Sequence, residues 1–336
     1  MATFVNDYST GCHPRIMQAL MDTNELETPG YGLDLYCQKA AEKLKILMGN
    51  DNADVHFLAG GTQTNATFIK GALRVHQGVI ACDSAHIAVH EAGAIEATGH
   101  KVITVKNKQG KLTCGLIDQV LKSHLDEHMV QPKMVYISQT TEYGTFYSDE
   151  EIKELYNYCQ SRGLLFYIDG ARLVSALAIN GAASLQTIAS NCDAFYFGGT
   201  KAGLLFGECL VIINRQLQDD FRYVIKQSGA MMAKGRILGV QFLELFSNEL
   251  YLSIGRHENA MANMIKDALV RKGYEQYLET FSNQLFFKMS QAEFDYINEE
   301  FEILCFEKHD DQIVARIVTS YATTFDIVNR FIKYVN

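Results

Sequence analysis

Polar and charged side chains follow several short apolar runs of this sequence, at the point where each run ends. Asp169 and Arg172 come after the run 163–168. Lys201 comes after the run 193–197. Gly60, Gly61 and Thr62 follow the run 55–59, and His86 follows shortly after the run 78–82. Lys201 is the least expected, because an unpaired buried charge costs several kcal/mol or loses its proton. Its side chain must reach water, pair with a carboxylate, or serve as a neutral amine.

One chemistry, that of pyridoxal phosphate (PLP), needs all of these parts together. A lysine forms a Schiff base with the cofactor, and a carboxylate pairs with its pyridine nitrogen. A glycine-rich loop that opens a helix binds the phosphate through backbone N–H groups. An imidazole stacks on the ring, and an arginine binds the substrate carboxylate through two hydrogen bonds. Taken singly, each feature has an ordinary explanation as a turn, a helix start or a packed histidine. Their combination predicts PLP as the cofactor.

The apolar runs predict the strands that position these residues. The expected strands are 55–60, 78–83, 100–106, 133–139, 163–169, 193–199 and 208–214. Amphipathic segments between them predict helices, among them 148–162 with Ser148 as its N-cap. This alternation predicts an α/β fold with a mostly parallel seven-stranded sheet and helices on both faces. Ligands bind at the carboxyl ends of such strands, where the polar residues lie.

The sequence pattern changes near residue 230. A long helix is expected over 234–272, followed by shorter strands and helices. We therefore predict an N-terminal arm over 1–14, a large PLP-binding α/β domain over 15–240, and a small α+β domain over 241–336.

Composition narrows the class of protein. The 336 residues carry a net charge of −9, which argues against a nucleic-acid-binding surface. The eight cysteines are scattered without a CxxC pair, as in reduced cytosolic proteins. The sequence has no leader pattern at its start and no apolar run long enough to span a membrane. We expect a cytoplasmic protein without a metal site, a membrane partner or a nucleic-acid partner.

Six segments resemble the threonine aldolase/β-eliminating lyase family of fold-type I PLP enzymes. They are PGYGLD (29–34), GGTQTN (60–65), DSAHIAVHEAGAIEATGHKV (83–102), YIDGARL (167–173), FGGTKAG (197–203) and ARIVTS (315–320). The resemblance covers nearly the whole chain. It implies a fold-type I PLP-dependent enzyme that cleaves the Cα–Cβ bond of a β-hydroxy-α-amino acid to glycine and an aldehyde.

The resemblance also implies roles toward the cofactor. Lys201 would form the Schiff base with PLP, Asp169 would pair with the pyridine nitrogen, and His86 would stack on the ring. The implied phosphate contacts are Gly61, Thr62 and Thr200.

Further roles concern the substrate and the assembly. Arg172 and Arg316 would bind the substrate carboxylate, helped by Asn6 or Ser9. Tyr31 lies in a loop that reaches a neighbouring subunit in this family. The resemblance implies a homotetramer, a dimer of dimers, with active sites at the subunit interfaces.

The sequence departs from the family where proton transfer is expected. Many members carry a histidine in an E-N-T-H-N loop, whereas this chain has Thr141 and Glu142 within 138–148. Threonine is no base at neutral pH, but a buried Glu142 with a raised pKa could be one. Many members also have a histidine after the threonine of ARIVTS, where this chain has Ser320.

These departures leave the reaction type open. An aminotransferase, a β-eliminating lyase or a racemase would use the same PLP residues, because the reaction depends on which Cα bond stands perpendicular to the cofactor ring. A catalytically inactive binding protein is disfavoured by the full set of residues. A nicotinamide-dependent oxidoreductase is disfavoured because no glycine fingerprint with a downstream acidic residue is present.

Overall fold

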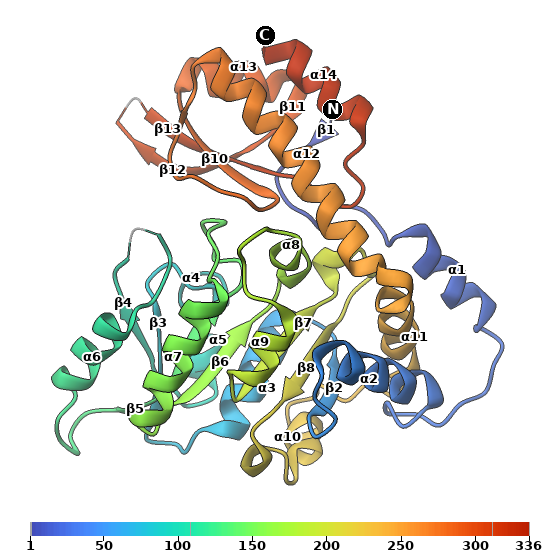
Figure 1. Cartoon of the computed structure of the whole chain (residues 1–336), viewed down its shortest axis with the longest axis vertical. Coiled ribbons are helices and arrows are strands. Elements are labelled where there is room, and N and C mark those ends of the chain that lie inside the picture. The colour runs from blue at the N-terminus through green and yellow to red at the C-terminus, as the bar shows by residue number, and fades with distance from the viewer. Residues whose placement is uncertain (1, 108, 311, 336) are drawn as a thin grey trace.

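A seven-stranded sheet forms the centre of the computed structural model, which describes residues 2–107, 109–310 and 312–335 (Figure 1). Its strands are β2 (Asp54–Leu58), β3 (Gln77–Cys82), β4 (Val102–Val105), β5 (Gln131–Ser138), β6 (Leu165–Asp169), β7 (Ala194–Gly198) and β8 (Glu208–Ile212). Their order is β2-β8-β7-β6-β5-β3-β4. All pairs are parallel except those of β8, which runs antiparallel to β2 and β7. The predicted mostly parallel seven-stranded sheet is confirmed.

Helices cover both faces of this sheet (Figure 1). They are α1 (Pro14–Asp22), α2 (Leu35–Met48), α3 (Gly61–Ala72), α4 (His86–Val89), α5 (Ala94–Ala97), α6 (Cys114–Ser123), α7 (Asp149–Ser161), α8 (Leu173–Leu177), α9 (Leu185–Ser190), α10 (Phe221–Gln227) and α11 (Arg236–Leu245). The chain moves one way along the sheet from β3 to β4 and the other way from β5 through β6 to β7. Right-handed crossovers in opposite directions place their helices on opposite faces.

Local signals set some helix ends. Ser148 caps α7 as predicted, and Glu151 completes a capping box with it. The single helix expected over 234–272 is wrong. The chain instead forms α11, the short 3-10 helix η3 (Ser247–Glu249) and α12 (Leu250–Lys272). Asn248 and Glu249 have φ angles of 51° and 54°, a left-handed conformation that interrupts a right-handed helix.

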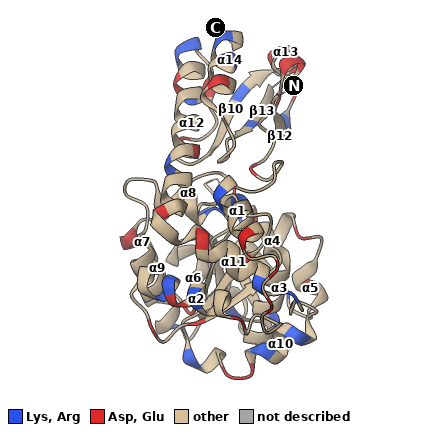
Figure 2. Ribbon diagram, turned by 90° about the vertical axis from the view of Figure 1, so that its right-hand side faces the viewer, with Lys and Arg blue, Asp and Glu red and all other residues tan. Residues whose placement is uncertain are grey.

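A second sheet lies beyond one end of the first (Figures 1 and 2). It is antiparallel and consists of β12 (Leu304–His309), β13 (Gln312–Val318), β10 (Gln284–Ser290) and β9 (Glu275–Gln276), in that order. The helices α13 (Gln291–Glu300) and α14 (Phe325–Val335) belong to this part. The helix α12 packs against α8 and α14 and so joins the two sheets.

The first residues of the chain pack with its last ones. The strand β1 (Ala2–Thr3) pairs in parallel with β11 (Phe301–Glu302), and Phe4 is buried in the C-terminal core beside Phe301 and Phe331. The boundaries at residues 14 and 240 remain predictions. Among the helices that the structure describes, none is long and apolar enough to cross a membrane.

Candidate active site

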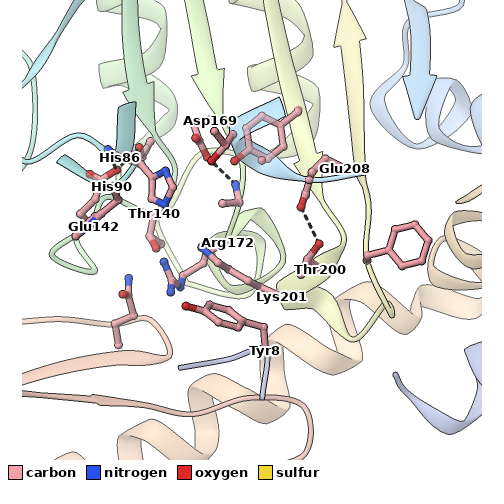
Figure 3. Close-up of a pocket in the computed structure, with 18 of the residues that line it drawn as sticks. Tyr8, His86, His90, Thr140, Glu142, Asp169, Arg172, Thr200, Lys201 and Glu208 are labelled. Atoms are coloured by element: carbon pink, nitrogen blue, oxygen red, sulfur yellow. Dashed lines mark hydrogen bonds between the residues drawn. The ribbon is translucent and has the colours of Figure 1, made fainter. Parts of the chain in front are cut away.

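A cavity of about 570 Å³ opens at the carboxyl ends of the central strands, beneath the C-terminal sheet. The predicted residues on its wall are Gly61, Thr62, His86, Glu142, Asp169, Arg172, Thr200, Lys201 and Arg316. Figure 3 shows that the labelled members of this set come from several elements and converge on one space. The strand-end rule, that ligands bind at the carboxyl ends of the strands of such a sheet, therefore correctly predicted that side chains distant in the sequence meet here.

Three predicted substrate contacts lie outside this wall. Tyr31 lines a second cavity of about 160 Å³ between α2 and α10. Asn6 accepts hydrogen bonds from the backbone N–H of Tyr8 (2.9 Å) and from the Ser9 hydroxyl (2.8 Å). Tyr8, which the sequence analysis did not select, is the side chain of this turn that lines the main cavity. Asn6 and Ser9 thus build the turn that presents Tyr8.

The start of α3 forms an anion site on the cavity wall. Gly60 is the N-cap residue, and no side chain caps the helix there. The first N–H groups of a helix lack partners within it and, with the helix dipole, attract anions. A Cβ atom on Gly61 would lie 3.2 Å from the Tyr196 hydroxyl oxygen, so glycine keeps this approach open. The phosphate of PLP fits this site.

The carboxylate of Asp169, the last residue of β6, is held by three donors. The Tyr136 hydroxyl donates to Oδ2 over 2.5 Å, and the side-chain amide of Asn65 donates to the same oxygen over 3.1 Å. The backbone N–H of Ala171 donates to Oδ1 over 2.9 Å. These bonds fix one orientation of a buried carboxylate, which is what pairing with a pyridine nitrogen requires.

The same network orients His86. Its Nδ1 atom lies 2.8 Å from Oε1 of Glu91, and the Asn65 amide donates to that oxygen over 2.8 Å. Because a carboxylate accepts, this contact places a proton on Nδ1 of His86. One buried amide therefore couples the predicted ring-stacking residue to Asp169. Asn65 and Glu91 lie in motifs that the sequence analysis quoted, but the two carboxylates that Asn65 joins, Glu91 and Asp169, are 26 and 104 positions away from it in the chain.

Lys201 lies in the 3-10 helix η1 (Thr200–Ala202), which follows β7 directly. Burial and the neighbouring Arg172 lower the pKa of Lys201, against the opposing pull of Asp7 and Asp169. A lowered pKa favours the neutral amine, the form that can attack a carbonyl. Of the three possibilities for this lysine, the structure favours the neutral amine.

Arg172 is paired with a carboxylate of the chain itself. Its Nε and Nη2 atoms donate to Asp7 over 2.7 and 3.2 Å, and the Asn283 amide also donates to Asp7 over 2.9 Å. Burial acts to raise the pKa of Asp7, but Arg172 and Lys201 together lower it. The side chains of Asp7 and Arg172 are 0% and 12% exposed, so the ion pair is buried.

Replacing Asp7 with alanine is expected to lower the free energy of unfolding by about 3–5 kcal/mol, because it leaves a buried guanidinium unpaired. Because the pKa of Asp7 is lowered in the folded state, its carboxylate stabilises the fold at pH values above the ordinary pKa of aspartate. This contribution is lost as the pH falls below about 4 through the lower folded-state pKa. Urea unfolding at pH 7 and at acidic pH measures both effects.

The matched control is Asp51→Ala, since Asp51 is exposed. This variant should change the free energy of unfolding by no more than about 0.5 kcal/mol. Equal stability of the Asp7 and Asp51 variants would contradict the prediction.

Arg316, on β13, keeps a donor free. Its Nη2 atom donates to the carbonyl oxygen of Val5 over 3.2 Å, while its buried Nε–H has no partner among the described residues. Burial and the nearby Arg172 lower the pKa of Arg316 to about 10. A buried, unpartnered donor on a cavity wall suits an anionic ligand such as a carboxylate.

Glu142 lies on the cavity wall in the loop that departs from the family pattern. Its Oε1 atom accepts from the backbone N–H of His86 (2.9 Å) and from the Ser138 hydroxyl (2.7 Å). Burial raises the pKa of Glu142 despite these bonds. A carboxyl group with a raised pKa can exchange protons near neutral pH.

His90 and Glu208 are wall residues that the sequence analysis missed. The His90 ring centroid lies 5.5 Å from that of His86, and burial followed by the charge of His86 lowers the pKa of His90. Its position four residues after His86 was a signal that both could lie on one helix face. Glu208 accepts a hydrogen bond from the Thr200 hydroxyl over 2.8 Å, so the predicted phosphate contact already has a partner.

Comparison with known proteins gives consistent matches. The model of the β-eliminating lyase family matches residues 4–291. A low-specificity L-threonine aldolase of a Pseudomonas species is 32% identical over 265 residues, which cover 78% of this chain and 76% of that protein. The solved threonine aldolase of Leishmania major is 42% identical, with a TM-score of 0.98 over 100% of this chain and 98% of that one. An aspartate aminotransferase variant of Thermus thermophilus, 12% identical, shares the fold with a TM-score of 0.73 over 99% of this chain and 90% of that one.

Proposed function

The chain belongs to the β-eliminating lyase family, and from this premise we propose that its cavity cleaves the Cα–Cβ bond of β-hydroxy-α-amino acids. It is a PLP-dependent lyase of the low-specificity threonine aldolase type. One structural observation carries the assignment: Lys201 and Asp169 line the same cavity as the uncapped start of α3.

PLP, when bound, supplies the electron sink for the negative charge that bond cleavage leaves at Cα. We assign the phosphate to Gly61 and Thr62, the ring nitrogen to Asp169, and the ring face to His86. Lys201 provides the amine that joins the cofactor. Thr200 is assigned as a further phosphate contact, which would require its hydroxyl to turn from Glu208.

The two arginines orient the substrate. Arg316 offers its free Nε–H to the substrate carboxylate, while Arg172 is held against the cavity by Asp7. Asn6 and Ser9 contribute through the turn that presents Tyr8. Holding the carboxylate fixes which Cα bond is aligned for cleavage, a positioning effect that can supply much of the rate.

Glu142 is assigned as the base that takes the β-hydroxyl proton. Replacing it with glutamine should lower kcat by about 10²-fold and leave PLP affinity unchanged, because the glutamine amide oxygen can still accept the bonds from the Ser138 hydroxyl and the backbone N–H of His86. In the parent protein kcat should rise with pH through the raised pKa of this carboxyl, and the variant should lose that step. Steady-state kinetics over a pH series measures both.

Glu150→Gln is the control, since Glu150 is exposed on α7. Unchanged kcat in the Glu142 variant would remove Glu142 from the reaction. His90 is then the candidate base, because its lowered pKa keeps the imidazole neutral. In that case His90→Gln should lower kcat instead.

Product analysis tests the function itself. Purified protein is incubated with the stereoisomers of threonine and phenylserine, and the release of glycine and of the matching aldehyde is measured. Equimolar glycine and aldehyde are expected. A keto acid, free ammonia or a racemised substrate without glycine would assign the protein to another PLP reaction.

We propose further that the protein is a cytoplasmic homo-oligomer with sites completed at subunit interfaces. Exposed apolar side chains gather in one segment: Met21, Leu26, Tyr31, Leu33 and Leu35. Tyr31 adopts a φ of 61°, and Arg222 donates to its carbonyl oxygen over 3.1 Å. Strained backbone of this kind is typical of functional positions.

Light scattering should give about four times the chain mass of 37.7 kDa, as a dimer of dimers would. A monomer would contradict the proposal.

A further inference from the structure

Two residues on the cavity wall carry buried polar atoms without a hydrogen-bond partner in the part of the chain that the structure describes. The atoms are Oγ1 of Thr140 and Oε1 of Gln284. Thr140 is 5% exposed and Gln284 is 0% exposed. A buried polar atom without a partner costs free energy, and such atoms are rare in native proteins. Two of them on one wall point to a ligand group that completes their bonds.

Thr140 is an exception in the loop between β5 and α7. The neighbouring side chains that have hydrogen-bond partners are Ser138, Gln139, Thr141 and Glu142. These bonds hold the loop in place on both sides of Thr140. Figure 3 shows Thr140 near Glu142 and His90 on one side of the cavity. The loop is therefore rigid there, and the Thr140 hydroxyl is left for a ligand.

One hydrogen bond fixes the direction of the Gln284 side-chain amide. Its Nε2 atom donates to the carbonyl oxygen of Thr141 over 3.4 Å. An amide turned by half a rotation would set its own oxygen against that carbonyl oxygen, so the nitrogen must take this place. The Oε1 atom of Gln284 consequently faces away from the loop backbone and keeps its capacity to accept a hydrogen bond.

Gln284 shares one face of the antiparallel pair β10 and β13 with Arg316. Arg316 lies directly opposite Phe286, and Gln284 is two residues before Phe286. Side chains two residues apart on a strand point to the same face. Diagonal neighbours on such a face are about 7–8 Å apart. One amino acid can span this separation, with its carboxylate at Arg316 and its side chain at Gln284.

The two free atoms specify the kind of group that fits between them. An amide oxygen only accepts hydrogen bonds, whereas a threonine hydroxyl donates or accepts. A single hydroxyl group satisfies both, because it donates to Oε1 of Gln284 and accepts from Oγ1 of Thr140. A carbonyl or carboxylate oxygen would repel Oε1. The positive charge of Arg316 on the same face disfavours an ammonium group.

We propose that Thr140 and Gln284 form a subsite for a hydroxyl group on the carbon atom next to Cβ of the substrate. Glu142, in the same loop as Thr140, is assigned to the β-hydroxyl group, and the substituent begins at the same carbon. The preferred substrates are then β-hydroxy-α-amino acids with a hydroxymethyl group at Cβ, which give glycine and a hydroxyaldehyde. The identity of the substrate rests on the proposed function.

Two substrates of nearly equal size test the subsite. In γ-hydroxythreonine the substituent at Cβ is hydroxymethyl, and in β-hydroxynorvaline it is ethyl. The PLP-loaded protein should cleave the first with a kcat/KM about 10–100-fold higher than the second of the same configuration, because ethyl leaves both buried atoms unpaired. Release of glycine and of the matching aldehyde measures both rates. Equal kcat/KM values would overturn the proposal.

Variants of the two residues locate the preference. Thr140→Val and Gln284→Met should each reduce the ratio of the two kcat/KM values by about 10-fold, and Thr140→Ser should retain it. Thr141→Val is the matched control, because the hydroxyl of this neighbouring threonine lies 2.7 Å from that of Thr145. It should keep the parent's ratio. A merely structural role would lower both kcat/KM values alike in the Thr140 and Gln284 variants, and this result would count against the proposal.

Two amino acids without a β-hydroxyl group separate the subsite from the proposed function. Homoserine carries hydroxymethyl at Cβ and norvaline carries ethyl, and neither can undergo the proposed cleavage. Calorimetric titration of the PLP-loaded protein should give a Kd about 10-fold lower for homoserine, and Thr140→Val should remove the difference. Equal affinities in the parent would overturn the subsite. Failure to cleave any β-hydroxy-α-amino acid would refute the proposed function, while the homoserine titration would still decide the subsite.

Discussion

Replacing Lys201 with alanine is expected to abolish the visible absorbance of the PLP-loaded protein and to lower the cleavage rate by about 10⁴-fold or more, the upper range for one acid–base group. Lys201 supplies the amine that joins the cofactor. Because its pKa is lowered, the same group can also accept and release a proton in the cavity. Alanine removes both. Absorbance after incubation with PLP and removal of the unbound cofactor measures the first loss, and single-turnover release of glycine measures the second.

Lys201→Arg distinguishes a reactive amine from a simple positive charge. A guanidinium stays protonated under all working conditions, so it supplies a positive charge but cannot act as a free amine. The arginine variant should therefore be as inactive as the alanine variant. Lys122→Ala, at an exposed position on α6, should keep the parent's absorbance and rate. An arginine variant with the parent's absorbance would refute the role of Lys201.

Much of the fold and family could be predicted from the sequence, because both depend on local patterns. All seven expected strands are present, since short apolar runs between amphipathic segments have few other stable arrangements. The edge that gathers Asp169 and Lys201 followed from the strand-end rule alone. No side-chain geometry was needed for this step.

The supporting residues could not be predicted, because their roles arise from contacts between distant parts of the chain. Asp7 and Arg172 are 165 positions apart, and nothing around Asp7 marks it as the partner of an arginine. Glu208 looked like one charge at the start of a strand. Its structural role comes from the turn at Gly199 and Thr200, whose backbone N–H and hydroxyl donate hydrogen bonds to it.

The break between α11 and α12 escaped prediction for a local reason. Residues 234–272 have no proline, and no glycine lies between Gly239 and Gly255, so the helical pattern runs on through 246–249. Of the two residues that adopt positive φ, Asn248 belongs to a type that tolerates this conformation, while Glu249 does not. Tertiary packing of α12 between α8 and α14 decides the geometry there.

The second large effect is expected at Asp169. Its carboxylate is fixed by Tyr136, Asn65 and Ala171, and the Asn65 amide links it to Glu91 beside His86. A preorganised charge of this kind needs no rearrangement when the electron demand on the cofactor ring rises. Its contribution should therefore appear in the chemical step and not in binding.

Asp169→Asn should lower kcat by about 10²–10³-fold, the effect of removing one preorganised electrostatic partner. The variant should still take up PLP with visible absorbance, because Lys201 and the start of α3 are untouched. Tyr136→Phe removes one donor to the same carboxylate and should cost about 1 kcal/mol, a smaller loss in kcat. If Asp169→Asn turned over at the parent rate, the cofactor would not depend on this carboxylate. Loss of PLP binding without loss of kcat in the fraction still loaded would make Asp169 a binding residue only.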